Sequence, residues 1–236
     1  MPHGNRQSTT TEAYMLAGVG GCVDAIGLLT LGGLFVSHMS GNTASLGEMF
    51  GQGRWSAGLP HLFSVPVFVL GIFLGYLCTT GTPSFRRCGL ILLTEAGLLA
   101  IFWAGLSRWG QQPINTVGYF LLATPPLLAM GLQNATLRQV GRSVFPTTYV
   151  TGVLDMLGKS AAEFIKQRGE PGAAAKGREL LGAAGIWLCY AVGAVTGGAG
   201  ILFFSHAILV LPVVILSGLG LFFLRVGGQV GGAKRE

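Results

Sequence analysis

Charged residues are scarce in this chain. Only 10% of its 236 residues are Asp, Glu, Lys or Arg, whereas soluble domains have about 25%. Half of the residues are hydrophobic and 39 are glycine, a residue that is more frequent in transmembrane helices than in soluble ones. The shortage of charge excludes an ordinary soluble domain and indicates an integral membrane protein.

Other absences exclude further classes of protein. The four cysteines have no CxxC spacing, so the sequence predicts buried free thiols rather than a zinc site or a disulfide framework. The ATP-binding pattern GxxxxGK[ST] is missing, which argues against primary pumping by this chain alone. Basic residues lie at the ends of apolar segments and form no stripe, so nucleic acid is not an expected partner. We also expect no metal, no cofactor and no enzymatic activity.

The chain does contain long apolar windows. A membrane-spanning helix needs about 20 mostly apolar residues, and six windows meet this requirement. The windows are 13–34, 59–80, 88–106, 114–137, 179–196 and 201–224. The sequence therefore predicts an all-α membrane protein with six transmembrane helices, the last two joined by a tight turn at 197–200.

Lys and Arg decide the predicted orientation. If the N-terminus lies inside and the six windows alternate, every Lys and Arg except Arg54 and Arg108 falls on the cytoplasmic side, as the positive-inside rule requires. Both termini are then cytoplasmic. The predicted division is a cytoplasmic tail over 1–12, a three-span repeat over 13–112, a second three-span repeat over 113–225, and a cytoplasmic tail over 226–236.

A polar stretch follows the first span. Residues 35–43 read Phe-Val-Ser-His-Met-Ser-Gly-Asn-Thr, and this run cannot continue a lipid-facing helix, because each unpaired backbone group in hydrocarbon costs several kcal/mol. The stretch is either an extracellular loop or a re-entrant break surrounded by protein or by a watery cavity. A second polar stretch, broken by Pro and Gly, lies at 145–152 and favours the re-entrant break.

The two stretches belong to an internal repeat. Each half holds three predicted spans, an odd number, so the halves would face opposite ways across the membrane. Inverted repeats that each carry a broken helix are the best sequence indication of a transporter site. The matched residues are Gly21 with Gly131, Asp24 with Asn134, Phe35 with Phe145, Ser40 with Thr151, Gly71 with Gly193, and Gly75 with Gly197.

The same stretches carry a family resemblance. Residues 23–27, 35–43, 130–135 and 148–152, and above all the runs Ser-Gly-Asn-Thr and Gly-Leu-Gln-Asn-Ala, resemble the YoaK-type family of small bacterial membrane proteins with six spans. The resemblance extends from about residue 13 to residue 224. It implies the six-span architecture and a location in the bacterial inner (plasma) membrane, and it implies no substrate.

Two carboxyl groups fall inside predicted spans, where a charge costs ~2.5–3.5 kcal/mol on insertion scales. Asp24 in the first span and Glu95 in the third are therefore candidate proton-coupling groups, although each could instead only tie helices together. His38 is either a pH-sensitive gate or a solvated loop histidine, while His61 and His206 are expected at the membrane interface.

The candidate substrate site joins the two breaks to the polar residues matched with them. Helix N-termini at the breaks would favour an anion or a carboxylate, although Ser45 and Glu48 could equally form a structural capping box there. The candidate substrate-binding residues are Phe35, Ser37, His38, Ser40, Gly41, Asn42, Thr43, Gln133, Asn134, Thr148, Thr151 and Gly152.

Together these patterns predict a small secondary transporter for a small polar solute, anionic rather than cationic, with proton coupling through Asp24 and Glu95. The alternatives are a channel and a structural or sensor membrane protein. An intramembrane serine hydrolase using Ser40 and His206 is a remote alternative, because the Gly-x-Ser-Gly elbow is missing. The expected partners are the solute and the lipid bilayer, and a small glycine-rich bundle is also compatible with a homodimer.

Overall fold

The computed structural model describes residues 4–79, 84–140, 150–168 and 172–232, with side chains described within 11–79, 84–135, 150–168 and 172–227. Within these ranges every regular element is a helix and no strand forms, which confirms the predicted all-α class. The elements are α1 (Gly4–Thr30), α2 (Met39–Gly51), α3 (Trp55–Thr79), α4 (Phe85–Trp109), α5 (Val117–Val140), α6 (Val150–Lys166), α7 (Ala173–Phe204), the 3₁₀ helix η1 (Ser205–Leu209) and α8 (Val210–Gly232).

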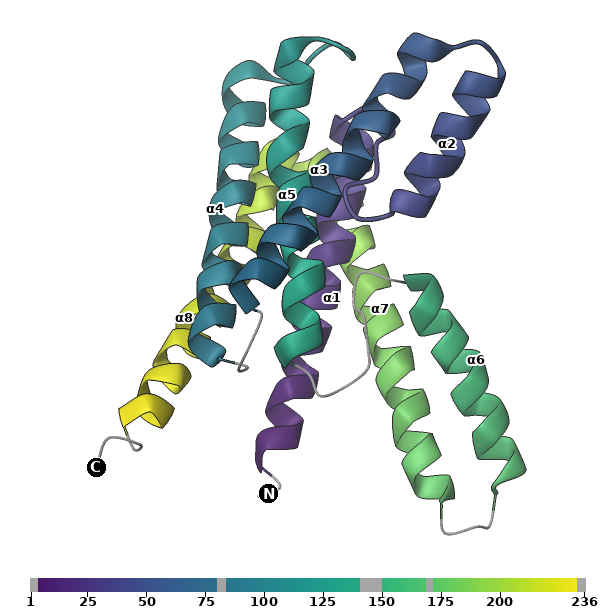
Figure 1. Ribbon diagram of the computed structural model, residues 1–236, viewed down its shortest axis with the longest axis vertical. Coiled ribbons are helices and arrows are strands. Elements are labelled where there is room, and N and C mark those ends of the chain that lie inside the picture. Colours follow the sequence, from purple (N-terminus) through teal and green to yellow (C-terminus); the bar gives the residue numbers. More distant parts are fainter. Residues whose placement is uncertain (1–3, 80–83, 141–149, 169–171, 233–236) are drawn as a thin grey trace.

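The direction of each helix can be followed along the chain (Figure 1). The chain ascends in α1, turns back, ascends again in the short α2, descends in α3 and ascends in α4. It then descends in α5 and α6, ascends in α7 and descends in α8, so both termini lie at the same end. The main packing pairs are α1 with α7, α3 with α5, and α4 with α8, and each short helix packs on the helix that follows it.

Glycines allow the closest of these contacts. A Cβ atom added at Gly193 of α7 would overlap the backbone carbonyl of Gly18 in α1, and one added at Gly131 of α5 would overlap the backbone of α3 at Phe68 and Gly71. Small residues let helix backbones approach closely in this way in membrane bundles. The α1–α7 and α3–α5 seams are therefore both built on glycine, at positions that the sequence repeat pairs.

The end of α1 also depends on glycine. Gly32 and Gly33 have φ values of 64° and 90°, a left-handed backbone that only glycine adopts readily. The N–H of Gly33 donates to the carbonyl of Leu28 at 3.0 Å, which satisfies one carbonyl group at the end of the helix. The chain can then reverse direction and lead into the break before α2.

A proline shapes the start of α3. Because Pro60 has no N–H, the carbonyl group of Ser56 one turn earlier loses its helical partner. The amide of Asn115, in the α4–α5 connection, donates to that carbonyl at 2.6 Å. Asn115 itself has a φ of 69°, so this hydrogen bond comes from a residue with a left-handed backbone conformation.

Four segments of the described chain are long and apolar enough to cross a membrane: residues 11–30 of α1, all of α3, all of α4, and residues 173–227. The last segment includes α7, η1 and most of α8, and α7 and α8 run in opposite directions (Figure 1). Helix α5 is not among the four, and it contains Pro125, Pro126 and the polar Gln133 and Asn134. The six-span division therefore stays a prediction.

Some finer expectations are wrong. The glycines at 197–200 do not form a turn but lie inside α7, where Gly197 contacts the backbone of α1 at Cys22. The turn comes later, at Ser205, whose φ is 51°. One thiol, that of Cys78, is exposed rather than buried.

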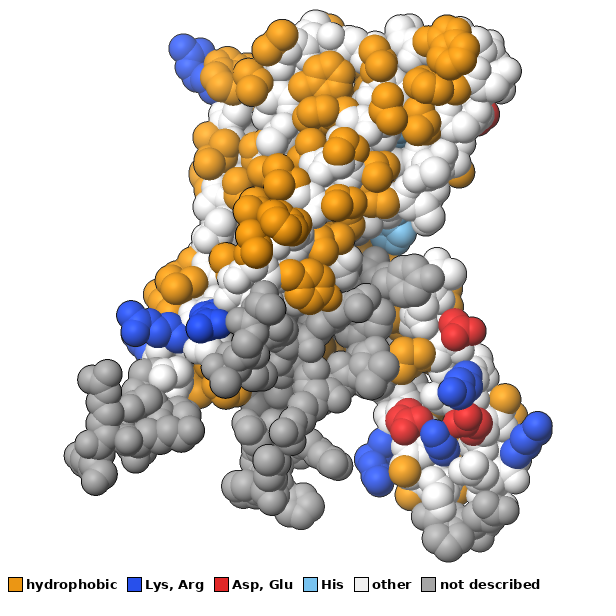
Figure 2. All heavy atoms as spheres, viewed as in Figure 1, with side chains coloured by type: hydrophobic (Ala, Val, Ile, Leu, Met, Phe, Trp, Pro, Cys, Tyr) orange, Lys and Arg blue, Asp and Glu red, His pale blue; other side chains and the backbone are white. Residues whose placement is uncertain are grey.

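Side-chain types are segregated along the long axis of the molecule. Figure 2 shows hydrophobic side chains over the upper part of α3, α4 and α5, while charged side chains gather mainly towards the end that carries the termini. Strongly exposed apolar residues such as Leu121, Val192 and Phe203 need a hydrophobic surrounding. This distribution is that of a bundle embedded in a bilayer.

Candidate functional site

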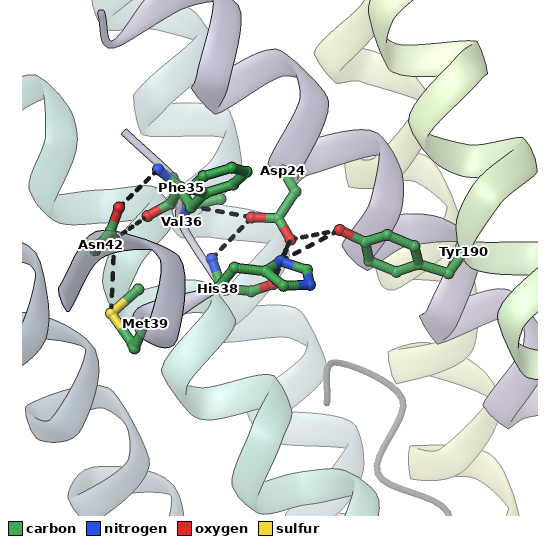
Figure 3. Close-up of polar contacts among 8 residues, drawn as sticks. Asp24, Phe35, Val36, His38, Met39, Asn42 and Tyr190 are labelled. Carbon is green, nitrogen blue, oxygen red and sulfur yellow. Dashed lines mark hydrogen bonds and ion pairs between the residues drawn. The ribbon is translucent and has the colours of Figure 1, made fainter. Parts of the chain in front are cut away.

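Asp24 of α1 is the centre of a polar cluster at the break between α1 and α2 (Figure 3). Its Oδ1 accepts hydrogen bonds from the backbone N–H groups of Val36 and Ser37, at 3.1 and 2.8 Å. Its Oδ2 accepts from the hydroxyl of Ser37, from Nδ1 of His38 at 2.8 Å, and from the hydroxyl of Tyr190 at 2.8 Å. The buried carboxylate therefore ties the irregular backbone of the break both to α1 and to α7.

The surroundings of Asp24 favour an ionised carboxylate, because backbone N–H groups and hydroxyl groups donate to both of its oxygens. With an ionised Asp24, His38 binds the carboxylate through a protonated Nδ1, which leaves Nε2 as its second polar atom. Figure 3 shows that this second ring nitrogen is directed away from Asp24. Because the imidazole is about a quarter exposed, His38 can offer Nε2 to a solute while Asp24 holds the ring in place.

Asn42, fully buried in the first turn of α2, forms a second cluster on the other side of the break. Its amide accepts from the N–H of Phe35 at 3.1 Å and donates to the carbonyl of the same residue at 2.7 Å. It also donates to the hydroxyl of Ser64 at 2.9 Å, and its oxygen lies 3.2 Å from Nδ1 of His61. Asn42 thus pins the break and the start of α2 to α3.

The positions that the predicted repeat matches in the α6–α7 hairpin are apolar. Extended to these residues, that repeat would pair Asn42 with Val153, His61 with Ala183, and Ser64 with Ile186. Val153, Ala183 and Ile186 are all buried and pack in one hydrophobic cluster. At these positions one hairpin is therefore held by buried hydrogen bonds and the other by aliphatic packing, to which an ion pair between Lys176 of α7 and Glu163 of α6 adds at the partly exposed surface.

The structure gathers five of the predicted residues into these clusters: Asp24, Phe35, Ser37, His38 and Asn42. The ring of Phe35 lies 5.8 Å from that of His38 between centroids. The interpretation of His38 as a solvated loop residue is wrong, because a buried carboxylate binds it.

The other predicted residues on α2 lie at the edge of this site. Gly41 faces the ring of Phe35. Ser40 and Thr43 are exposed, and the hydroxyl of Thr43 donates to the carbonyl of Met39 within the helix. The capping box is wrong, since α2 begins at Met39 and Ser45 lies in its second turn.

Candidates in the second half of the chain do not join the cluster. Thr151 and Gly152 occupy the first turn of α6, exposed and half-buried respectively, and Asn134 is half-buried on α5. Gln133 is fully buried and donates to the carbonyl of Leu16 at 2.7 Å. Thr148 lies outside the described residues.

Glu95 lies apart from the break, on α4. Its side chain is fully buried, and neither carboxyl oxygen has a hydrogen-bond partner within the described part of the chain. An ionised carboxylate in such a place would cost far more than a neutral one, so Glu95 holds a proton here. The two predicted coupling carboxyls thus differ: Asp24 is fully hydrogen-bonded and Glu95 is isolated.

Sequence reasoning missed Tyr190 and misplaced His61. Tyr190 reads as one more aromatic residue of an apolar span, and only its position three residues before Gly193, at the α1–α7 seam, indicates that it faces α1. His61 was expected at the interface but is buried, because Asn42 supplies a partner for its ring.

The fold and the cluster define a class: a multi-pass helical membrane protein with an ionised side chain buried at a helix break. The chain belongs to the family described as "Protein of unknown function (DUF1275)", whose model matches residues 13–222. It is 27% identical over 217 residues to UPF0700 transmembrane protein YoaK of Bacillus subtilis (strain 168), which covers 89% of this chain and 91% of that protein. The YoaK-type resemblance is thereby confirmed. No solved structure matches the chain.

Proposed function

We propose that this protein is a small secondary transporter for a small polar solute, anionic rather than cationic, with its site at the break between α1 and α2. The observation that carries the proposal is the ionised Asp24, which holds an irregular backbone segment and also reaches Tyr190 on α7. An ionised residue inside a membrane bundle is costly and typically marks a substrate or proton pathway.

The helix pairing supports an inverted repeat, in which the halves are 13–112 and 113–225. Exchanging the halves turns the α1–α7 pair into the α5–α3 pair and turns each short-helix hairpin into the other, as the observed contacts require. The corresponding helices also run in opposite directions (Figure 1). In a six-span protein with cytoplasmic termini in the bacterial inner membrane, the two short helices would then enter from opposite faces.

An anion fits the start of α2 better than a cation does. The first N–H groups of a helix have no intrahelical partner and carry the positive end of the helix dipole. His38 is the N-cap residue of α2, and its side chain makes no capping hydrogen bond. The N–H groups near Ser40 and Gly41 therefore provide donors for a carboxylate or an oxyanion. In the imidazolium form of His38, Nε2 would add a further donor.

Proton coupling follows from the same geometry. A proton on Oδ2 of Asp24 would remove the acceptor that Ser37, His38 and Tyr190 share, and so weaken the link between the break and α7. Protonation and opening of the α1–α7 seam would then occur together, which is the coupling that a proton-driven transporter needs. Glu95 would act as a separate proton-binding group on α4.

The serine and histidine of this cluster are Ser37 and His38, not the Ser40 and His206 of the hydrolase alternative, and their arrangement differs from a catalytic triad. In a triad the histidine uses one nitrogen for the serine and the other for the carboxylate. Here Ser37 and Nδ1 of His38 both bind the same oxygen of Asp24, and the hydroxyl of Ser37 lies 3.4 Å from that same Nδ1. The serine has no separate base.

The test begins with thermal-shift measurements on the purified protein at pH 5.5 and pH 7.5. The probes are acetate, phosphate, nitrate, uracil and glutamate, since a ligand of the folded state raises the melting temperature. A hit is then assayed for solute-driven proton uptake in proteoliposomes. We expect Asp24→Asn to lose proton uptake, while Asp155→Asn, which changes an exposed carboxylate on α6, retains it.

The outcomes separate the alternatives. A solute that binds but drives no flux in the wild-type protein would favour a sensor. Flux without proton uptake would favour a channel. Equal proton uptake by wild type and Asp24→Asn would remove Asp24 from the coupling mechanism.

A further inference from the structure

A groove lies on the outer face of the bundle where α1, α7 and α8 meet. Its volume is about 420 Å³, and its walls are almost wholly apolar, with Met15 and Val192 among the lining residues. Among the described side chains, none of those that line it is charged. The hydroxyl of Thr196, which lines the groove, already donates to the carbonyl of Val192 within α7. This hydroxyl therefore does not need a polar ligand as a partner.

The dimensions of the groove match one leaflet of a bilayer. It follows α1 from Thr11 to Cys22, a length of ~16 Å at 1.5 Å per residue. Half of a hydrocarbon core is ~15 Å thick. Thr11 is at the end of the segment nearer the N-terminus, so the groove opens towards the side where both termini lie (Figure 1).

The packing of the neighbouring helices explains why the groove exists. In the proposed repeat, α5 and α4 correspond to α1 and α8. Helix α4 packs along α5, and Leu122 of α5 fills the space beside Gly105 of α4. Helix α8, by contrast, contacts α1 only sparsely and diverges from it towards the termini. The space beside α5 is therefore filled by protein, whereas the space beside α1 is open to the bilayer.

We propose that this groove binds one acyl chain of a phospholipid from the leaflet on the side of the termini. A long, thin, apolar occupant of one-leaflet length is what the groove accommodates, and the bilayer supplies it. The back wall of the groove includes Gly18 and Gly193, the glycines of the α1–α7 seam. The bound chain therefore packs against the seam and stabilises it, while Asp24 and Tyr190 do not line the groove. This inference does not depend on transport.

Neighbouring residues of α7 provide a matched pair of variants. Thr196 lines the groove, whereas Val195 is about 70% exposed and does not line it. Thr196→Phe fills the groove, and Val195→Phe adds the same ring to the ordinary lipid-facing surface. Ile215→Trp fills the groove from α8 and serves if the first variant fails to fold.

The experiment is native mass spectrometry of delipidated protein titrated with palmitoyl-oleoyl phosphatidylglycerol. We expect the wild type and Val195→Phe to bind one lipid saturably, and Thr196→Phe to bind it at least 10-fold more weakly. Retention that does not saturate in the wild type, or that is equal in the two phenylalanine variants, would overturn the proposal.

A second measurement needs no variant. A phospholipid with a diazirine in its acyl chain is photo-crosslinked to the wild-type protein in vesicles. We expect saturable labelling of peptides that contain Met15 and Val192, and competition by unlabelled lipid. Even labelling of all exposed apolar residues, or no labelling of the groove peptides, would refute the assignment.

Discussion

Tyr190→Phe removes one hydroxyl group and nothing else, so it tests whether the link between α1 and α7 is a hydrogen bond to a charged group. The hydroxyl donates to Asp24 at 2.8 Å. The chain offers a matched control in Tyr119, a buried tyrosine of α5 whose hydroxyl donates at 2.9 Å to the neutral carbonyl of Leu31. The two substitutions differ mainly in the charge of the acceptor.

The expected magnitudes follow from that difference. Hydrogen bonds inside membrane proteins contribute about 0.6 kcal/mol on average and at most about 1.7, whereas bonds to charged groups in proteins contribute about 1.5–3 kcal/mol. We therefore expect Tyr190→Phe to cost about 1.5 kcal/mol and Tyr119→Phe about 0.6. At about 2–4 °C per kcal/mol for a chain of this size, the melting temperature falls by about 3–6 °C and 1–2 °C.

The assay is thermal unfolding of both variants in one detergent at pH 7.5, repeated in the Asp24→Asn background. In that background the excess effect of Tyr190→Phe should disappear, because the charged acceptor is gone. If Tyr190→Phe costs no more than Tyr119→Phe, or if its cost is unchanged by Asp24→Asn, the hydroxyl does not bind an ionised carboxylate and the proposed link fails.

Three further changes probe the seam, the isolated acid and the pinned hairpin, and each is measured by detergent-phase unfolding. Gly193→Ala should cost about 1–3 kcal/mol, because the new methyl group overlaps the backbone of α1. Gly47→Ala on α2 places its methyl group in open space and should stabilise the protein by about 0.5–1 kcal/mol. If the two glycine substitutions changed stability equally, the close approach of α1 and α7 at Gly193 would be contradicted. Glu95→Leu should stabilise by about 1–3 kcal/mol, because it removes a buried polar group without a partner in the described structure; a loss of stability would mean that the carboxyl has a partner. Asn42→Val should cost about 2–4 kcal/mol, because four polar groups lose their partner, and an unchanged midpoint would show that the cluster is not formed.

The parts of the fold that depend on composition and period could be predicted from the sequence. The apolar windows predict the long helices, and the paired polar stretches at residues 35–43 and 145–152 indicate the break between α1 and α2. The turn between α7 and α8 could not be placed, because the glycines at 197–200 serve helix packing rather than chain reversal. A glycine-rich stretch can mark either a turn or a close contact between helices, and only its neighbour in space distinguishes the two.

The site was predictable where the chemistry is local. Asp24, Ser37, His38 and Asn42 lie within 19 positions of one another in the sequence, and their unusual polarity in an apolar region identifies them. Tyr190 joins Asp24 from 166 positions away, and His61 is buried only because Asn42 faces it. Pairings of that kind depend on helix packing, which the local sequence pattern does not specify.

The difference between the two hairpins has a mechanical consequence. Hydrogen bonds such as those of Asn42 are directional and hold one register, because they weaken steeply when the donor angle changes. Aliphatic contacts such as those of Val153, Ala183 and Ile186 have no preferred direction, so neighbouring registers have similar energies. The ion pair between Lys176 and Glu163 that also joins α6 to α7 is partly exposed, and such pairs contribute little. In any conformational cycle, we therefore expect the α2–α3 hairpin to keep its register more strictly than the α6–α7 hairpin.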